Sequence, residues 1–353
     1  MRIVRSRTIQ ATSPGWTIRE QLEMRKMTQK ELAARMDMSE KHISQLINGE
    51  VRLMPEIANR LEAILGVPAY FWNNLEAYYR ERVIQAQEEN DMDADIELAK
   101  KVPYAEIVKL GWVAPTRKPV ERVKNLRRYF EVARLKVLEK LGMPRIAYRK
   151  LGKNNNDDFD YVLATWVQKA RLLARDIEVS PINLQKLSSY IPKIRQLTSE
   201  APEIFCQKIE SILAECGIAI VFLAHLKGSF LHGASFIEGK KIVIGLTVRG
   251  SYADKFWFSL FHELGHILNG HITKPEGLTD EDEKDADKFA RDVLIPPEKY
   301  ESFIADDNFS LDTVKNFADK IGIDAGIVVG RLQRDAKINF NQLNELKKSY
   351  KLD

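Results

Sequence analysis

The 353-residue sequence has little cysteine and no long apolar run. Its two cysteines, Cys206 and Cys216, are isolated, so CxxC motifs of zinc ribbons or redox proteins are excluded. We expect free thiols in a reducing compartment. No apolar stretch approaches the roughly 18 residues that cross a bilayer, and the start lacks a signal-peptide core. The sequence therefore predicts a cytoplasmic protein with no membrane partner.

Charge is nearly balanced overall but is unevenly distributed. The net charge is +4, with 54 Lys and Arg against 50 Asp and Glu. Residues 101–150 contain fourteen basic against four acidic residues, whereas residues 251–320 contain eight against sixteen. Such asymmetry can steer nucleic acid to one part of a chain and basic substrates to another. A basic helical connector is an equally good interpretation of 101–150.

The stretch from His262 to His266 reads His-Glu-Leu-Gly-His, the HExxH pattern. Residues at i and i+4 share one helix face, so both imidazoles can meet one metal ion. Glu263 can then act on water bound to that ion. We expect Asp254 to cap the start of this helix and Gly270 to end it. HExxH occurs by chance in ordinary helices, so the interpretation needs a further ligand.

An acidic helix over residues 283–296 can supply that ligand. Glu283 is the first choice, with Asp285 in reserve, and a His2Glu set leaves a fourth position for water, as in catalytic zinc sites. Asp287, one turn after Glu283, can accept a hydrogen bond from a metal-binding histidine. The alternative is a solvated acidic face.

His271 departs from the spacing of a third metal ligand. Metzincins place a third histidine six residues after the second, but His271 follows His266 by five, with Asn269 in the glycine position. We therefore expect His271 at the surface, or touching a metal ligand from outside, and not on the metal.

Residues 255–268, the segment 283–290 and the closing Leu-Ile-Pro at 294–296 resemble the ImmA/IrrE family of zincin-like metallopeptidases. The resemblance implies that His262, His266 and Glu283 bind Zn²⁺, with Mn²⁺ as an alternative, and that Glu263 is catalytic. Family members commonly have asparagine where this chain has Asp287. Characterised relatives cut helix-turn-helix repressors, so the resemblance implies a protein substrate of that kind.

The amino-terminal region has the pattern of a helix-turn-helix. Thr28 to Glu31 has the form of a capping box, Ser39 can cap a second helix over 40–48, and Asp37 can take a left-handed turn between them. A plain helical hairpin with a polar face is the alternative. Polar side chains left on the outer face suit bases and phosphates, and the predicted DNA-binding residues are Gln29, Ser39, Lys41, Ser44, Gln45 and Asn48.

Residues 10–85 also resemble HigA-type antitoxins of the Cro/C1 (XRE) class. The resemblance rests on Thr-Gln-Lys-Glu-Leu-Ala at 28–33, Ile-Asn-Gly at 47–49 and Phe-Trp-Asn-Asn-Leu at 71–75. It implies binding of operator DNA as a homodimer, and a cognate toxin as a further partner.

A small β-rich region precedes the HExxH helix. Strands are expected over 218–224, 229–237 and 241–247, with a turn at Gly239. In a zincin an edge strand pairs with extended substrate, and Ala234–Phe236 is the edge that we expect.

These observations predict a mainly α fold with a small β-sheet (α+β). A five-helix helix-turn-helix domain and a zincin-like metallopeptidase domain are joined by a helical region. The expected parts are a DNA-binding domain at 10–85, a basic helical connection at 86–200, a metallopeptidase domain at 201–300 and a helical hairpin at 301–353.

Two functions fit this organisation. The first is an antitoxin-like transcriptional regulator with a zinc endopeptidase domain. The alternative is a non-proteolytic regulator whose zincin domain senses metal or binds a partner. For the peptidase, an oxyanion-stabilising residue is still needed, and His232, Arg249 and Tyr252 are candidates because they flank the site in sequence.

Overall fold

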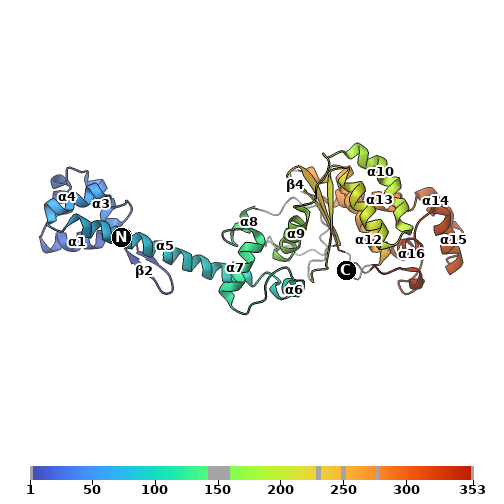
Figure 1. Cartoon of the computed structure of the whole chain (residues 1–353), viewed down its shortest axis with the longest axis horizontal. Helices are drawn as coiled ribbons and strands as arrows, with labels where there is room; N and C mark the ends of the chain where they lie inside the picture. Colours follow the sequence, from blue (N-terminus) through green and yellow to red (C-terminus); the bar gives the residue numbers. More distant parts are fainter. Residues whose placement is uncertain (1–2, 142–159, 228–231, 248–251, 275–277, 351–353) are drawn as a thin grey trace. The chain divides into compact units, whose positions relative to one another are not determined.

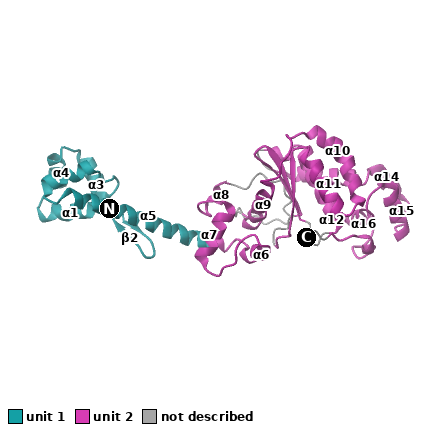
Figure 2. Ribbon diagram, in the orientation of Figure 1, with its two compact units in different colours: residues 1–98 teal, residues 99–353 magenta. Residues whose placement is uncertain are grey.

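The structure is a computed structural model that describes residues 3–141, 160–227, 232–247, 252–274 and 278–350 (Figure 1). It divides into two compact units, Met1–Leu98 and Ala99–Asp353 (Figure 2). The described residues are mainly helical with two small sheets, which confirms the predicted fold class. None of the helices described here is both long and apolar enough to span a membrane.

The first unit contains the predicted five helices. Their apolar faces enclose one core in which Ile18, Leu32, Ile43 and Trp72 are fully buried. The fifth helix continues without a break past residue 85, into the region where the sequence predicted a helical connection. The bounds are α1 (Gly15–Met24), α2 (Gln29–Arg35), α3 (Glu40–Asn48), α4 (Pro55–Leu65) and α5 (Ala69–Ala99).

An antiparallel hairpin of β1 (Ile3–Arg5) and β2 (Gln10–Thr12) precedes these helices, and the sequence did not predict it. Contacts with the second half of α5 hold it in place. The Glu89 carboxylate accepts hydrogen bonds from the hydroxyls of Ser6 and Thr8, and the bond from Ser6 is the main cause of a lowered pKa at Glu89.

In its described residues, the second unit begins with six α-helices: α6 (Tyr104–Lys109), α7 (Pro119–Phe130), α8 (Val137–Leu141), α9 (Tyr161–Ala174), α10 (Leu184–Gln196) and α11 (Pro202–Ala214). They are followed by a three-stranded sheet with the order β3-β5-β4. In it, β3 (Ile218–Leu223) is parallel to β5 (Lys241–Thr247), and β4 (Gly233–Glu238) is antiparallel to β5.

The expected strand positions agree with this sheet. Gly239 takes the left-handed backbone, with φ of 61°, in the turn between β4 and β5. Ala234–Phe236 lies in β4, which is an edge of the sheet as expected. The described part of this strand starts at Gly233, and the first residues of the predicted strand, 229–231, lie outside the described residues.

Five α-helices follow the sheet in the part of the chain that is described: α12 (Ala253–Leu268), α13 (Asp280–Leu294), α14 (Pro297–Ala305), α15 (Leu311–Ile321) and α16 (Ala325–Arg334). The HExxH pattern lies in α12. Gly265 allows α13 to approach closely, since a Cβ there would lie 3.2 Å from the Cα of Ala286. The last described residues return to α12, where Trp257 Nε1 donates a hydrogen bond to the hydroxyl of Tyr350 at 2.9 Å.

The expectation that Asp254 caps α12 is wrong. The residue at the N-cap position is Tyr252, whose side chain makes no capping hydrogen bond. Asp254 lies in the first turn and pairs with Lys347, with 2.8 Å between Oδ2 and Nζ. Gly270 does end the helix region, with φ of 72°.

Candidate metal centre and helix-turn-helix

The HExxH helix brings two imidazoles and one carboxylate to a single point. The Nε2 atoms of His262 and His266 lie 3.0 Å apart. From the Glu283 carboxylate, one oxygen is 3.4 Å from Nε2 of His262 and the other is 3.5 Å from Nε2 of His266. Among the described residues, these three form the group whose ligand atoms all lie within 4.8 Å of one another.

These separations fit a tetrahedral ion. Zinc ligands at about 2.0–2.1 Å lie about 3.4 Å from one another in a regular tetrahedron. The donor set also fits, because both oxygens of Glu283 are buried and accept no hydrogen bond from the described residues. Three electron-pair donors thus converge where a cation would satisfy all of them. The reserve ligand Asp285 is exposed on α13 and does not belong to this group.

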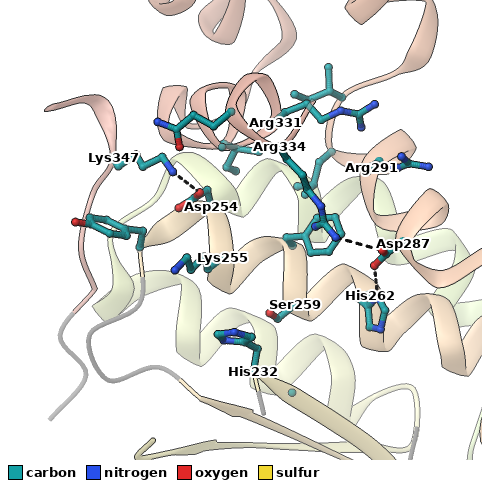
Figure 3. Close-up of a pocket in the computed structure, with 18 of the residues that line it drawn as sticks. His232, Asp254, Lys255, Ser259, His262, Asp287, Arg291, Arg331, Arg334 and Lys347 are labelled. Atoms are coloured by element: carbon teal, nitrogen blue, oxygen red, sulfur yellow. Dashed lines mark hydrogen bonds and ion pairs between the residues drawn. The ribbon is translucent and has the colours of Figure 1, made fainter. Parts of the chain in front are cut away.

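Asp287 orients one of the two histidines. Its Oδ1 lies 3.0 Å from Nδ1 of His262, and its Oδ2 lies 3.2 Å from a guanidinium nitrogen of Arg334 (Figure 3). A carboxylate in this position accepts the Nδ1–H proton, which leaves the Nε2 lone pair for a metal. Arg334 also lies over the ring of Phe258, 4.4 Å from its centroid. Asp287 therefore lies where the sequence placed it, and Arg334 was not foreseen.

His271 holds the second histidine, so of the two positions that the sequence left open it takes the one against a metal ligand and not the one at the surface. It is buried, and its Nδ1 lies 3.0 Å from Nδ1 of His266. Its Nε2 lies 3.3 Å from Oδ1 of Asp282, which also binds Lys274 at 2.6 Å. The left-handed turn at Gly270 folds the chain back beneath α12. His271 thus takes the alternative that the sequence left open, touching a ligand from outside.

The local charges favour an ionised carboxylate facing the histidines. Burial lowers the pKa of His262, but the hydrogen bond with Asp287 and the nearby Glu283 outweigh it and raise that pKa to about 9. Burial opposes ionisation of Glu283, yet the two histidines lower its pKa to about 2. Without a metal ion, the ionised Glu283 therefore faces a protonated His262 at neutral pH, and a cation that binds there would replace that proton.

Glu263 lies beside this group and against the edge strand. Its side chain is buried, burial raises its pKa, and its Oε2 atom has no hydrogen-bond partner among the described residues. A Cβ on Gly233, the first residue of β4, would lie only 3.0 Å from Oε1 of Glu263. The carboxylate can approach the strand because residue 233 has no side chain.

A cavity of about 560 Å³ opens from this site along α12. His232 and Tyr252 line it, as does Ser259 (Figure 3). Two of the three residues suggested for oxyanion stabilisation therefore border the cavity. The third, Arg249, lies outside the described residues.

In the first unit, the helix-turn-helix has the expected geometry. Thr28 Oγ1 accepts the backbone N–H of Glu31, and Ser39 Oγ accepts that of His42, so both helices are capped. Asp37 takes the left-handed conformation with φ of 52°. Of the predicted DNA-binding residues, Gln29, Ser39 and Lys41 are exposed, and Ser44, Gln45 and Asn48 are partly buried.

Comparison with known proteins agrees with this geometry. Residues 18–72 match a family model described as helix-turn-helix. None of the curated proteins matches the chain. The amino-terminal unit thus contains a helix-turn-helix domain, which supports a DNA-binding transcriptional regulator and makes DNA the partner best supported. The matched residues all lie in the first unit and do not include the sheet, α12 or α13. Any function proposed for the second unit is therefore argued from the geometry of its own residues.

Proposed function

We propose that this chain is a DNA-binding transcriptional regulator that carries a zinc-dependent endopeptidase of the ImmA/IrrE type. One observation supports the peptidase most strongly. A buried carboxylate, Glu263, lies between a His2Glu group and an edge strand. A structural zinc site needs only its ligands, whereas peptide hydrolysis also needs a base beside the attacked carbonyl.

Each residue of the site has a separate proposed role in peptide hydrolysis. His262, His266 and Glu283 would hold the ion, which when bound supplies Lewis acidity and a water of lowered pKa. Glu263 accepts the proton of the attacking water and returns it to the departing amine. Among the described residues β4 pairs with β5 alone, so its other edge can bind the substrate backbone as an added strand. His232 and Tyr252 are the described candidates for a donor to the oxyanion.

The DNA-binding half of the proposal rests on α2 and α3. Gln29 is the first residue of α2, and we propose that it contacts a phosphate. Along α3 follow the other proposed contacts, Lys41, Ser44, Gln45 and Asn48. Ser39 caps α3 and keeps its hydroxyl near the same surface. We propose that a homodimer binds operator DNA in the cytoplasm, as HigA-type antitoxins do, with a toxin as a further partner.

A comparison of protein amino termini in cells tests the proteolytic function. Cells that express the wild type are compared with cells that express Glu263→Gln, which keeps the metal ligands. We expect a cleavage product found only with the wild type, and a helix-turn-helix repressor is the substrate that we propose. The control is equal operator binding and equal metal content of the two proteins. Identical termini under several stresses would favour the alternative, a non-proteolytic regulator whose second unit senses metal.

A further inference from the structure

We infer that the exposed face of α7 in the second unit is a further DNA-binding surface, which contacts the phosphate backbone and does not read the base sequence. This inference rests on the DNA-binding half of the proposed function and adds a second contact surface to it. The sequence left two interpretations open for residues 101–150, a basic connector or a surface for nucleic acid. They are decided by which charges of this region are already paired within the chain.

Each carboxylate among residues 101–141 has a partner. This part of the region contains eleven Lys and Arg against four Glu. Glu139 accepts a hydrogen bond from the hydroxyl of Tyr161 at 2.8 Å, and the other three form ion pairs. The negative charges of the region are therefore largely used within the chain. The ion pairs are Glu106 with Lys109, Glu121 with Lys118 and Glu131 with Arg175, at 2.9, 3.0 and 2.5 Å.

Two cations on α7 have no such partner. Lys124 and Arg128 are exposed, and neither forms an ion pair with a described residue. They are four residues apart, so their side chains share one face of the helix. Glu121, one turn before Lys124, is already held by Lys118 and by the hydroxyl of Thr116. Two like charges therefore remain side by side on this face, where they repel each other and where a polyanion would stabilise them.

The same spacing recurs at α8. Lys136, just before this helix, and Lys140 within it are exposed and form no ion pair with a described residue. The exposed face of an ordinary solvated helix mixes both signs, because oppositely charged residues four apart stabilise it. Two successive helices with a like-charged pair at this spacing depart from that pattern. The departure favours a surface for a polyanion over a connector that contacts only solvent.

The opposite face of α7 is packed against the protein. Tyr129 links it to α9 by two hydrogen bonds, since its hydroxyl donates to the backbone oxygen of Thr165 at 2.7 Å and its own backbone oxygen accepts from Nε2 of Gln168 at 3.0 Å. A helix held in this way need not be ordered when a partner binds, which lowers the entropic cost of binding. The buried residues of this face are Val123, Leu126, Tyr129 and Phe130.

The spacing of the two cations suits a DNA strand. Four residues advance about 6 Å along a helix at about 1.5 Å per residue. Successive phosphates of one strand advance about 3.4 Å along the duplex axis. Lys124 and Arg128 can therefore each meet a different phosphate of one strand when α7 lies along it. The helix-turn-helix match in the same chain makes DNA the polyanion that we infer.

The test measures how DNA binding by the full-length protein depends on salt. One duplex is selected by the wild type from a random pool, and a second has the same bases in scrambled order. Each lost phosphate contact reduces the slope of log K against log salt concentration by about one. We expect Lys124→Gln with Arg128→Gln to reduce that slope by about two for each bound protomer, on both duplexes. Binding at about 0.1 M salt should weaken about 10–100-fold.

Two further double variants make the result specific. Lys124→Arg with Arg128→Lys keeps both charges and should keep the wild-type slope, because a phosphate contact depends mainly on charge. Lys299→Gln with Lys315→Gln removes the same charge from exposed positions of α14 and α15 and should also keep it. An equal reduction in this second control would trace the effect to net charge and would overturn the inference.

The remaining outcomes separate the inference from the proposed function. An unchanged slope in Lys124→Gln, Arg128→Gln overturns the inference and leaves DNA binding by the helix-turn-helix standing. A loss confined to the selected duplex also overturns it, because a phosphate contact does not depend on base sequence. If the wild type binds neither duplex, both the inference and the proposed DNA binding are wrong.

Discussion

Nδ1 of His271 lies 3.0 Å from Nδ1 of His266, and this pair fixes which nitrogen of His266 faces the metal position. Oδ1 of Asp282, which also pairs with Lys274, lies 3.3 Å from Nε2 of His271 and favours the proton on that nitrogen. Nδ1 of His271 must then be the acceptor and Nδ1–H of His266 the donor. The lone pair of His266 is left on Nε2, the atom nearest Glu283.

Removing the acceptor at residue 271 tests this chain of hydrogen bonds. In His271→Ala nothing holds the proton of His266 on Nδ1, so Nε2 is less often free to bind the metal. We therefore expect zinc affinity to fall about 10–100-fold. His271→Gln, which keeps an acceptor oxygen, should lose less. Zinc dissociation constants measured against a competing chelator report the effect without any peptidase assay. The exposed His225→Ala in the same unit is the control, and wild-type affinity in His271→Ala would contradict the assignment.

Asp287 offers a second test, since it holds the other histidine. Its Oδ1 accepts from His262, and an amide oxygen can do the same. Asp287→Asn should therefore keep zinc affinity within about tenfold of the wild type, whereas Asp287→Ala should lose about 10–100-fold. The first substitution also matches the residue that ImmA/IrrE relatives commonly have. The same chelator competition measures both, and equal losses would show that the charge matters more than the hydrogen bond.

The features that could be predicted from the sequence are those that depend on the spacing of residues within one helix. His262, His266 and Glu263 share a turn, and Glu283 and Asp287 are separated by four residues, so helical periodicity alone places them on common faces. The five helices of the first unit and the turn at Asp37 follow in the same way from capping residues and apolar periodicity.

What the sequence did not predict depends on contacts between distant residues. The spacing after His266 left two positions open for His271, and the left-handed turn at Gly270, which spacing does not reveal, decides between them. Asp254 pairs with Lys347, which is 93 residues away in the sequence. The Asp254 carboxylate is therefore not used to cap α12. The hairpin at the amino terminus is held through Glu89 on α5. Periodicity carries no information about such partners.

DNA recognition gives a third prediction, on α2 and α3. Gln29→Ala removes a proposed phosphate contact, so binding should weaken about equally on all DNA sequences. Gln45→Ala removes a proposed base contact, so discrimination at one base pair should fall by about 1–3 kcal/mol. Both are measured by selecting DNA from a random pool and titrating the preferred site at several salt concentrations. Gln87→Ala, on the exposed side of α5, is the control. If Gln45→Ala weakened binding equally on all DNA sequences, Gln45 would be a phosphate contact and not a base contact.

Gly233 gives the most direct test of Glu263 as the base. An added Cβ at this residue would lie 3.0 Å from Oε1 of Glu263 and 2.9 Å from Cδ2 of Leu246, so Gly233→Ala must displace the carboxylate or the strand. The three atoms nearest to that methyl group belong to Leu246 and Glu263, and none belongs to a metal ligand. We therefore expect kcat to fall by about 10²-fold while zinc affinity stays within about twofold, because a displacement of about 1 Å has that effect on a catalytic group. Kinetics on a cleaved peptide and the chelator competition measure the two quantities. A parallel loss of zinc would mean that the strand supports the metal centre, whereas unchanged kcat would show that Glu263 does not work from this position.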